Sequence, residues 1–276
     1  MSKISAADVK KLREMTGAGM MDCKKALAEA GGDFDKAIEV LRKKGQKLSA
    51  KRADREAKEG VVLALTSEDR TKGVIVKLSC ETDFVAKNED FVNLTKSFAE
   101  IALKEFPADR EALLATDYNG MSIQDKVTEQ IGVIGEKIDL AEYASLESDM
   151  VAPYIHMGNK AAVLVGLNKA SDDVFNAGRD VAMQVAAMHP IAVDSDGVDA
   201  TVVNKEIEIG MEQARQQGKP EAMLEKIARG KLNKFFREVT LLNQSFVKDN
   251  KQSVSAYLKT IDGDLTVTDF KHVKLG

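Results

Sequence analysis

The chain has 276 residues, of which 44% are hydrophobic and 30% are charged, and its formal net charge is -4. This length and apolar content are sufficient to bury a substantial core, and the length favours two or three modules over one. No basic block is large enough to indicate a general binder of nucleic-acid backbones, and no apolar run approaches the roughly 18 residues of a membrane span, so we expect no direct nucleic-acid contact, no membrane insertion and a cytoplasmic location.

The first 45 residues predict three short helices. Ser5 and Asp8 form a capping pair at the start of the first helix, which stops at the glycines of "TGAGM". Asp33 caps the third helix, where Phe34 and Ile38 open an apolar stripe at helical spacing. We therefore expect a three-helix domain over residues 1–45, a size near the lower limit for independent folding.

Residues 46–58 are strongly charged, and their single large apolar residue is Leu48. One such residue cannot drive burial, so this segment is predicted to be a solvated charged linker that is helical in part. Contact between its basic residues and RNA remains a less favoured alternative.

From residue 59 onward the chain repeats a hairpin-then-helix pattern. "GVVLALTSEDRTKGVIVKLSC" and "APYIHMGNKAAVLVGLNKA" each contain two apolar strands around a polar turn, followed by an amphipathic helix. Each copy then adds a further helix and a final strand. We therefore predict an α+β core of two related antiparallel sheet-plus-helix subdomains, an N-subdomain over 59–149 and a C-subdomain over 150–276.

The second copy carries an extra segment over about residues 202–239. Two apolar stripes flank "QQGKP", which turns the chain. Neither stripe can be buried by its own helix, so the segment is predicted to be an antiparallel coiled-coil hairpin. Such arms typically mediate self-association or grip a partner, and a homodimer formed through the core or the coiled coil is one expectation.

An insertion in the first copy presents a phenylalanine at a corner. When the two copies are aligned, "ETDFVAKN" (81–88) falls where the second copy has fewer residues, between a strand and a helix capped by Asn88. Inserted residues at such a place lie on the surface, so Phe84 is a candidate apolar wedge for a partner's pocket. The structural alternative, in which Phe84 packs back against Phe91 or Leu94 at the helix entry, is equally compatible with the spacing.

The sequence gives little indication of a catalytic site or a metal site. Cys23 and Cys80 lie far apart and are predicted to be small buried hydrophobes, and the glycines of "GAGMMD" lack the GK[ST] of a phosphate-binding loop. His156, His189 and His272 occur in no known nucleophile context. We therefore expect no enzyme activity and no cofactor.

Two long segments, "LREMTGAGMMDCKKAL" (12–27) and "CETDFVAKN" (80–88), resemble the signature sequences of the bacterial elongation factor Ts family. The resemblance extends over nearly the whole chain. It implies a guanine nucleotide exchange factor that binds elongation factor Tu in its GDP-bound and nucleotide-free forms, and a three-helix domain that is ubiquitin-associated-like and binds the partner. The residues implied to disturb the magnesium site of elongation factor Tu are Thr82, Asp83, Phe84 and Val85.

The resemblance also implies further contacts with the partner. "TGAGMM" places Met20 and Met21 where the three-helix domain touches the GTPase. "IGEKI" places Ile134 and Gly135, and "YIHMGNKAAVLV" places His156 at a second contact of the core. The alternative is a non-catalytic adaptor with the same architecture, in which the three-helix domain binds peptides and no nucleotide is released.

Overall fold

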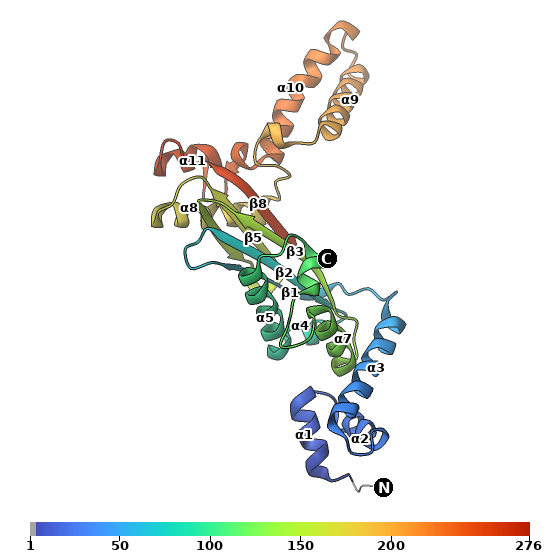
Figure 1. The fold of residues 1–276 in the computed structure, drawn as a ribbon. Helices are drawn as coiled ribbons and strands as arrows, with labels where there is room; N and C mark the ends of the chain where they lie inside the picture. The colour runs from blue at the N-terminus through green and yellow to red at the C-terminus, as the bar shows by residue number, and fades with distance from the viewer. Residues whose placement is uncertain (1–3) are drawn as a thin grey trace.

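The computed structural model describes residues 4–276. The molecule is elongated, with the N-terminal helices at one end, a double sheet in the middle and a helical arm at the other end (Figure 1). Among residues 4–276, no helix has both the length and the apolar character needed to cross a membrane.

Three helices form the N-terminal end, and the expected caps are present. These helices are α1 (Ala6–Thr16), α2 (Met20–Glu29) and α3 (Phe34–Arg52). Ser5 and Asp8 form a complete capping box, and the Asp33 side chain accepts a hydrogen bond from Lys36 N. A small core that includes Leu12, Cys23, Leu27 and Ala37 holds the helices together.

The third helix continues unbroken through residues 46–52, the first part of the segment that was expected to be a charged linker. It crosses α7 (Ile123–Ile134) at Gly45, which is buried against the backbone of Thr128 and Gly132. Leu48 is half-buried against the core of the first sheet. The two helices can approach closely because Gly45 and Gly132 at the contact have no side chain, as much as because of apolar residues. The hydrophobic pattern therefore did not reveal this contact.

The first sheet has the order β1-β2-β3 and is antiparallel throughout. Helices α5 and α7 cover one of its faces, and Phe91, Phe98, Val127 and Ile131 bury their side chains there. The remaining elements of this region are β1 (Glu59–Thr66), β2 (Lys72–Cys80), α4 (Asp83–Ala86), α5 (Glu89–Glu105), α6 (Arg110–Ala115) and β3 (Asp139–Glu147).

The second sheet has the order β4-β5-β8. As in the first sheet, the first two strands form a hairpin and the last strand pairs with the second strand of that hairpin. Helix α8 covers its outer face together with α11. The elements are β4 (Met150–Ile155), the 3-10 turn η1 (Met157–Asn159), β5 (Ala161–Leu167), α8 (Asp172–Met188), α11 (Val254–Ile261) and β8 (Val267–Lys274).

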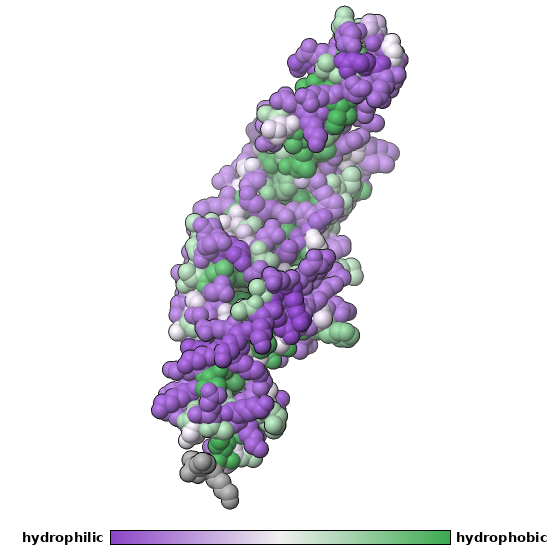
Figure 2. Space-filling view, turned by 90° about the vertical axis from the view of Figure 1, so that its right-hand side faces the viewer, coloured by the Kyte–Doolittle hydropathy of each residue, from purple (hydrophilic) through white to green (hydrophobic). Residues whose placement is uncertain are grey.

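The arm interrupts this second unit, close to the expected boundaries of 202–239. It consists of α9 (Ala200–Gln216) and α10 (Glu221–Val239), which pack closely where Gly210 meets Ala228. Hydrophobic residues gather in patches along the arm between hydrophilic ones (Figure 2). The short elements around it are η2 (Ser195–Gly197), η3 (Leu241–Asn243), β6 (Ser245–Phe246) and β7 (Asp249–Ser253).

The two sheets pack face to face through a third apolar layer, which includes Val62, Ile75, Val151 and Leu164. The core thus has four layers, helices on sheet on sheet on helices. This arrangement confirms the predicted α+β class with antiparallel sheets. Sequence reasoning missed α6 and the β6–β7 hairpin, because neither element is long enough to show a clear period.

Candidate partner-binding site

The loop after β2 forms a single helical turn that holds Phe84 outward. Thr82 is the N-cap of α4 and accepts a hydrogen bond from Val85 N, and Asn88 then caps α5 through a bond from Asp90 N. These two caps turn the chain twice within a short distance. Phe84 lies between them and is 83% exposed, so the alternative in which it staples the entry of α5 is excluded.

The insertion itself is visible in the connections. Residues 81–88 join β2 to α5, whereas only residues 168–171 join β5 to α8 at the corresponding place of the second sheet. The additional length of the first connection is the α4 turn. Neither sheet needs this turn for its own hydrogen bonding; Val85 and Ala86 of the turn pack against the core, and Phe84 is displayed to solvent.

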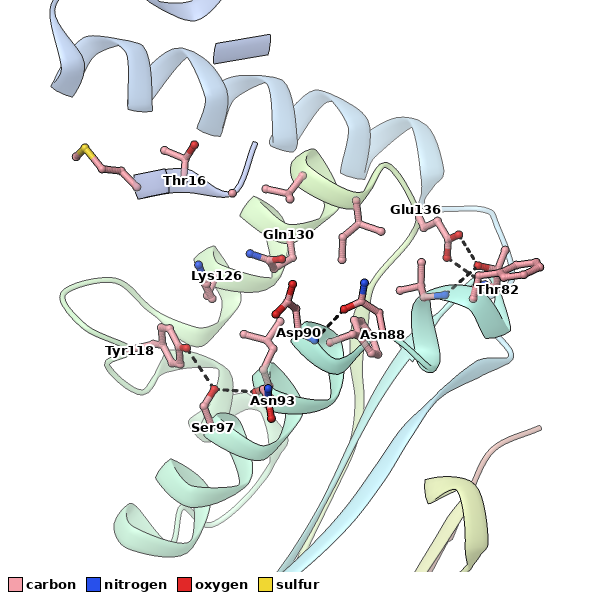
Figure 3. A pocket seen from close by; sticks show the side chains of 18 residues that line it. Thr16, Thr82, Asn88, Asp90, Asn93, Ser97, Tyr118, Lys126, Gln130 and Glu136 are labelled. Atoms are coloured by element: carbon pink, nitrogen blue, oxygen red, sulfur yellow. Dashed lines mark hydrogen bonds between the residues drawn. The ribbon is translucent and has the colours of Figure 1, made fainter. Parts of the chain in front are cut away.

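Two carboxylates that were not anticipated anchor this turn. Glu136 Oε2 accepts a hydrogen bond from Glu81 N (3.1 Å). Glu136 is also bonded to Thr82 (Figure 3): its Oε2 accepts from Thr82 N (3.0 Å) and its Oε1 accepts from the Thr82 hydroxyl (2.6 Å). Glu81 in turn accepts bonds from Lys137 N, Arg52 and Arg55. The start of the loop is therefore fixed by charge-assisted hydrogen bonds on both sides.

The electrostatics of Glu81 follow from these partners. Burial alone raises the pKa of its carboxyl group, but the bonds from Lys137 N, Arg55 and Arg52 outweigh that effect and hold the pKa at about 2. Only 17% of the Glu81 side chain is exposed. Glu81 is therefore ionised at neutral pH and joins the end of α3 to the end of β2.

Asp83 forms an ion pair within α4. Its carboxylate lies 2.6 Å from the Lys87 ammonium group one turn later. The hydrogen bond from Lys87 lowers the pKa of Asp83, and the same bond raises the pKa of Lys87. Both side chains are exposed, so Asp83 can exchange Lys87 for a donor of another molecule at small cost.

A cleft of about 900 Å³ separates the N-terminal helices from the first helical layer of the core. Its walls come from the end of α1 (Met15 to Gly17), from α4 and α5, and from α7. Phe84 and Val85 are among its lining residues. Polar groups such as Lys126 and Gln130 of α7 also line it (Figure 3). The cleft is a mixed apolar and polar groove with an exposed aromatic ring beside it, which is typical of a surface that binds a protein.

Ile134 and Gly135 lie close to the Phe84 turn. Ile134 is half-buried and lines the cleft, and Gly135 ends α7 in the left-handed conformation (φ 81). A glycine adopts this conformation without strain and lets the chain reverse into β3. Gly135 therefore brings Glu136 next to Thr82.

His156 is exposed and lies at the same end of the double sheet as the Phe84 turn. Lys77 near the end of β2 donates a hydrogen bond to Lys274 O, and Lys274 pairs with Ala161 just after η1. The Tyr154 hydroxyl lies 3.2 Å from His156 Nδ1. Met157, which was not anticipated, extends beside it and is 87% exposed.

Met20 and Met21 are exposed on the first turn of α2, at 57% and 63% respectively. They do not line the cleft, unlike Met15 at the end of the preceding helix. The structure therefore brings Thr82–Val85, Ile134 and Gly135 together, and it leaves the two methionines on a separate part of the N-terminal end.

The two cysteines are poor candidates for covalent chemistry. Burial raises the pKa of the Cys80 thiol to about 12, so this group is a poor nucleophile, and Cys23 is also buried and free. Within residues 4–276, no group of three His, Cys, Asp or Glu side chains is placed to hold a metal ion. The exposed ring, the cleft and the anchored turn are instead features of a binding surface.

Comparisons with known proteins agree with this character. The profile of the family described as Elongation factor TS matches residues 81–276. Among curated proteins, Elongation factor Ts of Christiangramia forsetii is 57% identical to this chain over 276 residues and covers 100% of both chains. Elongation factor Ts of Flavobacterium psychrophilum is 53% identical over 100% of both chains, and that of Porphyromonas gingivalis is 46% identical over 99% of this chain and 98% of its own.

Proposed function

Because the chain belongs to the elongation factor Ts family, we propose that it is a guanine nucleotide exchange factor for elongation factor Tu in the elongation stage of translation, in the cytoplasm. It acts by binding and makes or breaks no covalent bond. It needs no cofactor of its own and contacts neither membrane nor nucleic acid in this role.

Linkage explains how binding alone releases a nucleotide. A GTPase holds GDP through backbone donors around the phosphates and through a magnesium ion that neutralises their charge. A protein that binds the nucleotide-free GTPase more tightly than the GDP-bound form must weaken GDP binding by the same factor. GDP then leaves faster, and GTP fills the empty site.

Phe84 is the group to which we assign the main effect. It enters the GTPase near the residues that support the magnesium shell, while Thr82 and Val85 fix the turn and Asp83 exchanges Lys87 for a donor of the partner. The observation that carries this proposal is the 83% exposure of a phenylalanine on an anchored helical turn. A rigid aromatic side chain gains binding energy at a low cost in conformational entropy.

The remaining contacts extend the interface over the molecule. We assign Met20 and Met21 to the contact made by the three-helix domain, which we regard as ubiquitin-associated-like, and Ile134 and Gly135 to the contact beside Phe84. His156 provides a second contact from the core. Its exposure, and its position at the same end of the double sheet as Phe84, support that role.

The architecture suggests how the exchange factor is built. We propose that residues 59–149 and 150–276 are related subdomains, because the hairpin-helix-strand order and the strand pairing are the same in both sheets. Only the first retains the α4 turn. The α9–α10 arm, or the core, pairs two copies of the chain, and a native mass measurement of the free protein and of its complex tests that pairing.

The test of the function is the release of fluorescent GDP from elongation factor Tu. Catalytic amounts of this protein should accelerate release, and Phe84→Ala should lower the stimulated rate by about 30-fold, the effect of losing a strong hot-spot side chain. We expect the affinity for nucleotide-free elongation factor Tu to fall by less. Val247→Ala, which removes an exposed apolar side chain from the β6–β7 turn, is the matched control and should leave release unchanged.

Two results would contradict this account. Binding without any acceleration of release would identify a non-catalytic adaptor. Equal losses of stimulated rate and of affinity in Phe84→Ala would make Phe84 an ordinary part of the interface rather than the group that displaces the nucleotide.

A further inference from the structure

We propose that Glu136 is a positioning residue for nucleotide exchange: its carboxylate holds the Thr82–Val85 turn in the orientation that presents Phe84. This inference rests on the proposed function and adds to it a residue outside the turn. Glu136 acts through Thr82 and need not touch elongation factor Tu.

The contacts of Glu136 reach the first turn of α4 in two steps. Both carboxylate oxygens are engaged, one by the backbone N–H groups of Glu81 and Thr82 and the other by the Thr82 hydroxyl. The Thr82 Oγ1 atom then accepts the hydrogen bond from Val85 N that caps α4. Phe84 lies inside this capped turn, so the carboxylate, the cap and the ring form one connected unit.

The turn needs such support because it is too short to be stable alone. Helix α4 contains only the four residues Asp83–Ala86; none of them is fully buried, and only Val85 and Ala86 are half-buried against the core of the first sheet. A single helical turn fixes many dihedral angles for few hydrogen bonds, so an isolated turn of this length is unfolded in water. An external anion that accepts several bonds at its N-terminal end offsets that cost.

Glu136 is held in place by the same elements that it supports. Gly135 N donates to Ile131 O (2.9 Å) and ends α7, so the chain enters residue 136 in a fixed direction. Next to it, Lys137 N donates to Glu81 Oε1 (2.6 Å). The bonds are reciprocal: the carboxylate of Glu136 accepts from the backbone of 81–82, and the carboxylate of Glu81 accepts from the backbone of 137.

The same network of hydrogen bonds extends to the N-terminal domain. Arg52 and Arg55, at and just beyond the end of α3, bond to Glu81, and the Lys137 ammonium group donates to Ala53 O and Arg55 O. The orientation of Phe84 and the position of α3 are therefore set at one junction. Glu136, which follows Ile134 and Gly135, therefore belongs to the site through its hydrogen bonds, although it contributes no apolar surface.

The test uses Glu136→Gln in the full-length protein. The amide keeps an acceptor oxygen for the two backbone N–H groups and can donate to the Thr82 hydroxyl, but it carries no charge, so the bonds to the turn are no longer charge-assisted. We expect the maximal stimulated rate of GDP release to fall by about 10-fold or more, because charge-assisted bonds are lost. The concentration of this protein that gives half the maximal rate should change by no more than about 3-fold, since Glu136 acts through Thr82.

Glu129→Gln is the matched control. Glu129 lies on the preceding part of α7, its side chain is 15% exposed, and it bonds to Lys126 rather than to the turn. The control should retain the maximal rate of the natural protein. If Glu136→Gln also retained that rate, or if it changed only the half-maximal concentration, the positioning role would be wrong.

A second measurement is independent of elongation factor Tu. Hydrogen exchange at the amides of Glu81 and Thr82, which donate to Glu136, should be at least about 10-fold faster in Glu136→Gln while amides of β2 keep their protection. Unchanged exchange at these two amides would overturn the inference even if the protein proved to be an adaptor. If the natural protein failed to accelerate GDP release, the proposed function would fail, and the amide exchange would still decide whether Glu136 holds the turn.

Discussion

The close packing of α3 against α7 predicts that the N-terminal helices are held rigidly against the core. A Cβ atom added to Gly45 would lie 2.7 Å from Thr128 O and 3.7 Å from Gly132 Cα. The first distance is far shorter than a normal carbon–oxygen contact, and the obstructing atom is backbone. The variant Gly45→Ala must therefore push the two helices apart.

The magnitude follows from two opposing effects. Replacing glycine by alanine inside a helix stabilises it by roughly 0.5–1 kcal/mol, because the unfolded chain loses freedom. Overpacking a tight contact costs about 1–3 kcal/mol. We expect Gly45→Ala to lower the free energy of unfolding by up to about 2.5 kcal/mol. Gly230 in α10 has no atom within 4 Å of its added Cβ, so Gly230→Ala should stabilise the protein by up to about 1 kcal/mol.

The assay is denaturant unfolding of the two variants beside the natural protein, followed by affinity measurement with elongation factor Tu. Because α3 packs with α1, whose end forms one wall of the cleft, Gly45→Ala should also weaken the complex, whereas Gly230→Ala should not. If Gly45→Ala stabilised the protein as much as Gly230→Ala, the contact between α3 and α7 would be loosely packed. The N-terminal helices would then be flexibly attached to the core rather than held in a fixed position.

Two further predictions concern single groups. Glu81→Gln should destabilise the protein at neutral pH by up to about 3 kcal/mol, because the folded pKa of Glu81, about 2, lies below the ordinary value of 4.5 for a glutamate. A depressed pKa contributes stability above pH 4.5, and this contribution is lost as the pH falls towards 2. The free energies of unfolding of the natural protein and of Glu81→Gln should therefore converge between pH 4.5 and pH 2. A constant difference between the two proteins over that range would contradict the argument. Met20→Ala combined with Met21→Ala should leave the free energy of unfolding within about 0.5 kcal/mol, since both side chains are exposed, and should lower the affinity for elongation factor Tu measured by calorimetry. Unchanged affinity would make them plain surface residues.

Local chemistry determined much of the fold. Ser5, Asp33 and Asn88 each cap a helix where the sequence placed a cap, and the alternating strands of both hairpins pair as expected. These features depend on neighbours within a few residues, on side chains that bond to nearby backbone groups and on a regular apolar period. The four-residue turn of α4 and the short α6 gave no such period.

The orientation of Phe84 was open in the sequence, because both an exposed wedge and a helix staple fit the same spacing. The tertiary structure decided for exposure, since Glu136 and Glu81 hold the turn from elements far away in the chain. Likewise Gly45 meets Gly132 across α3 and α7. Charged groups and glycines at such separations have no periodic pattern, because their partners are chosen by the packing of whole elements, and only the folded chain brings them together.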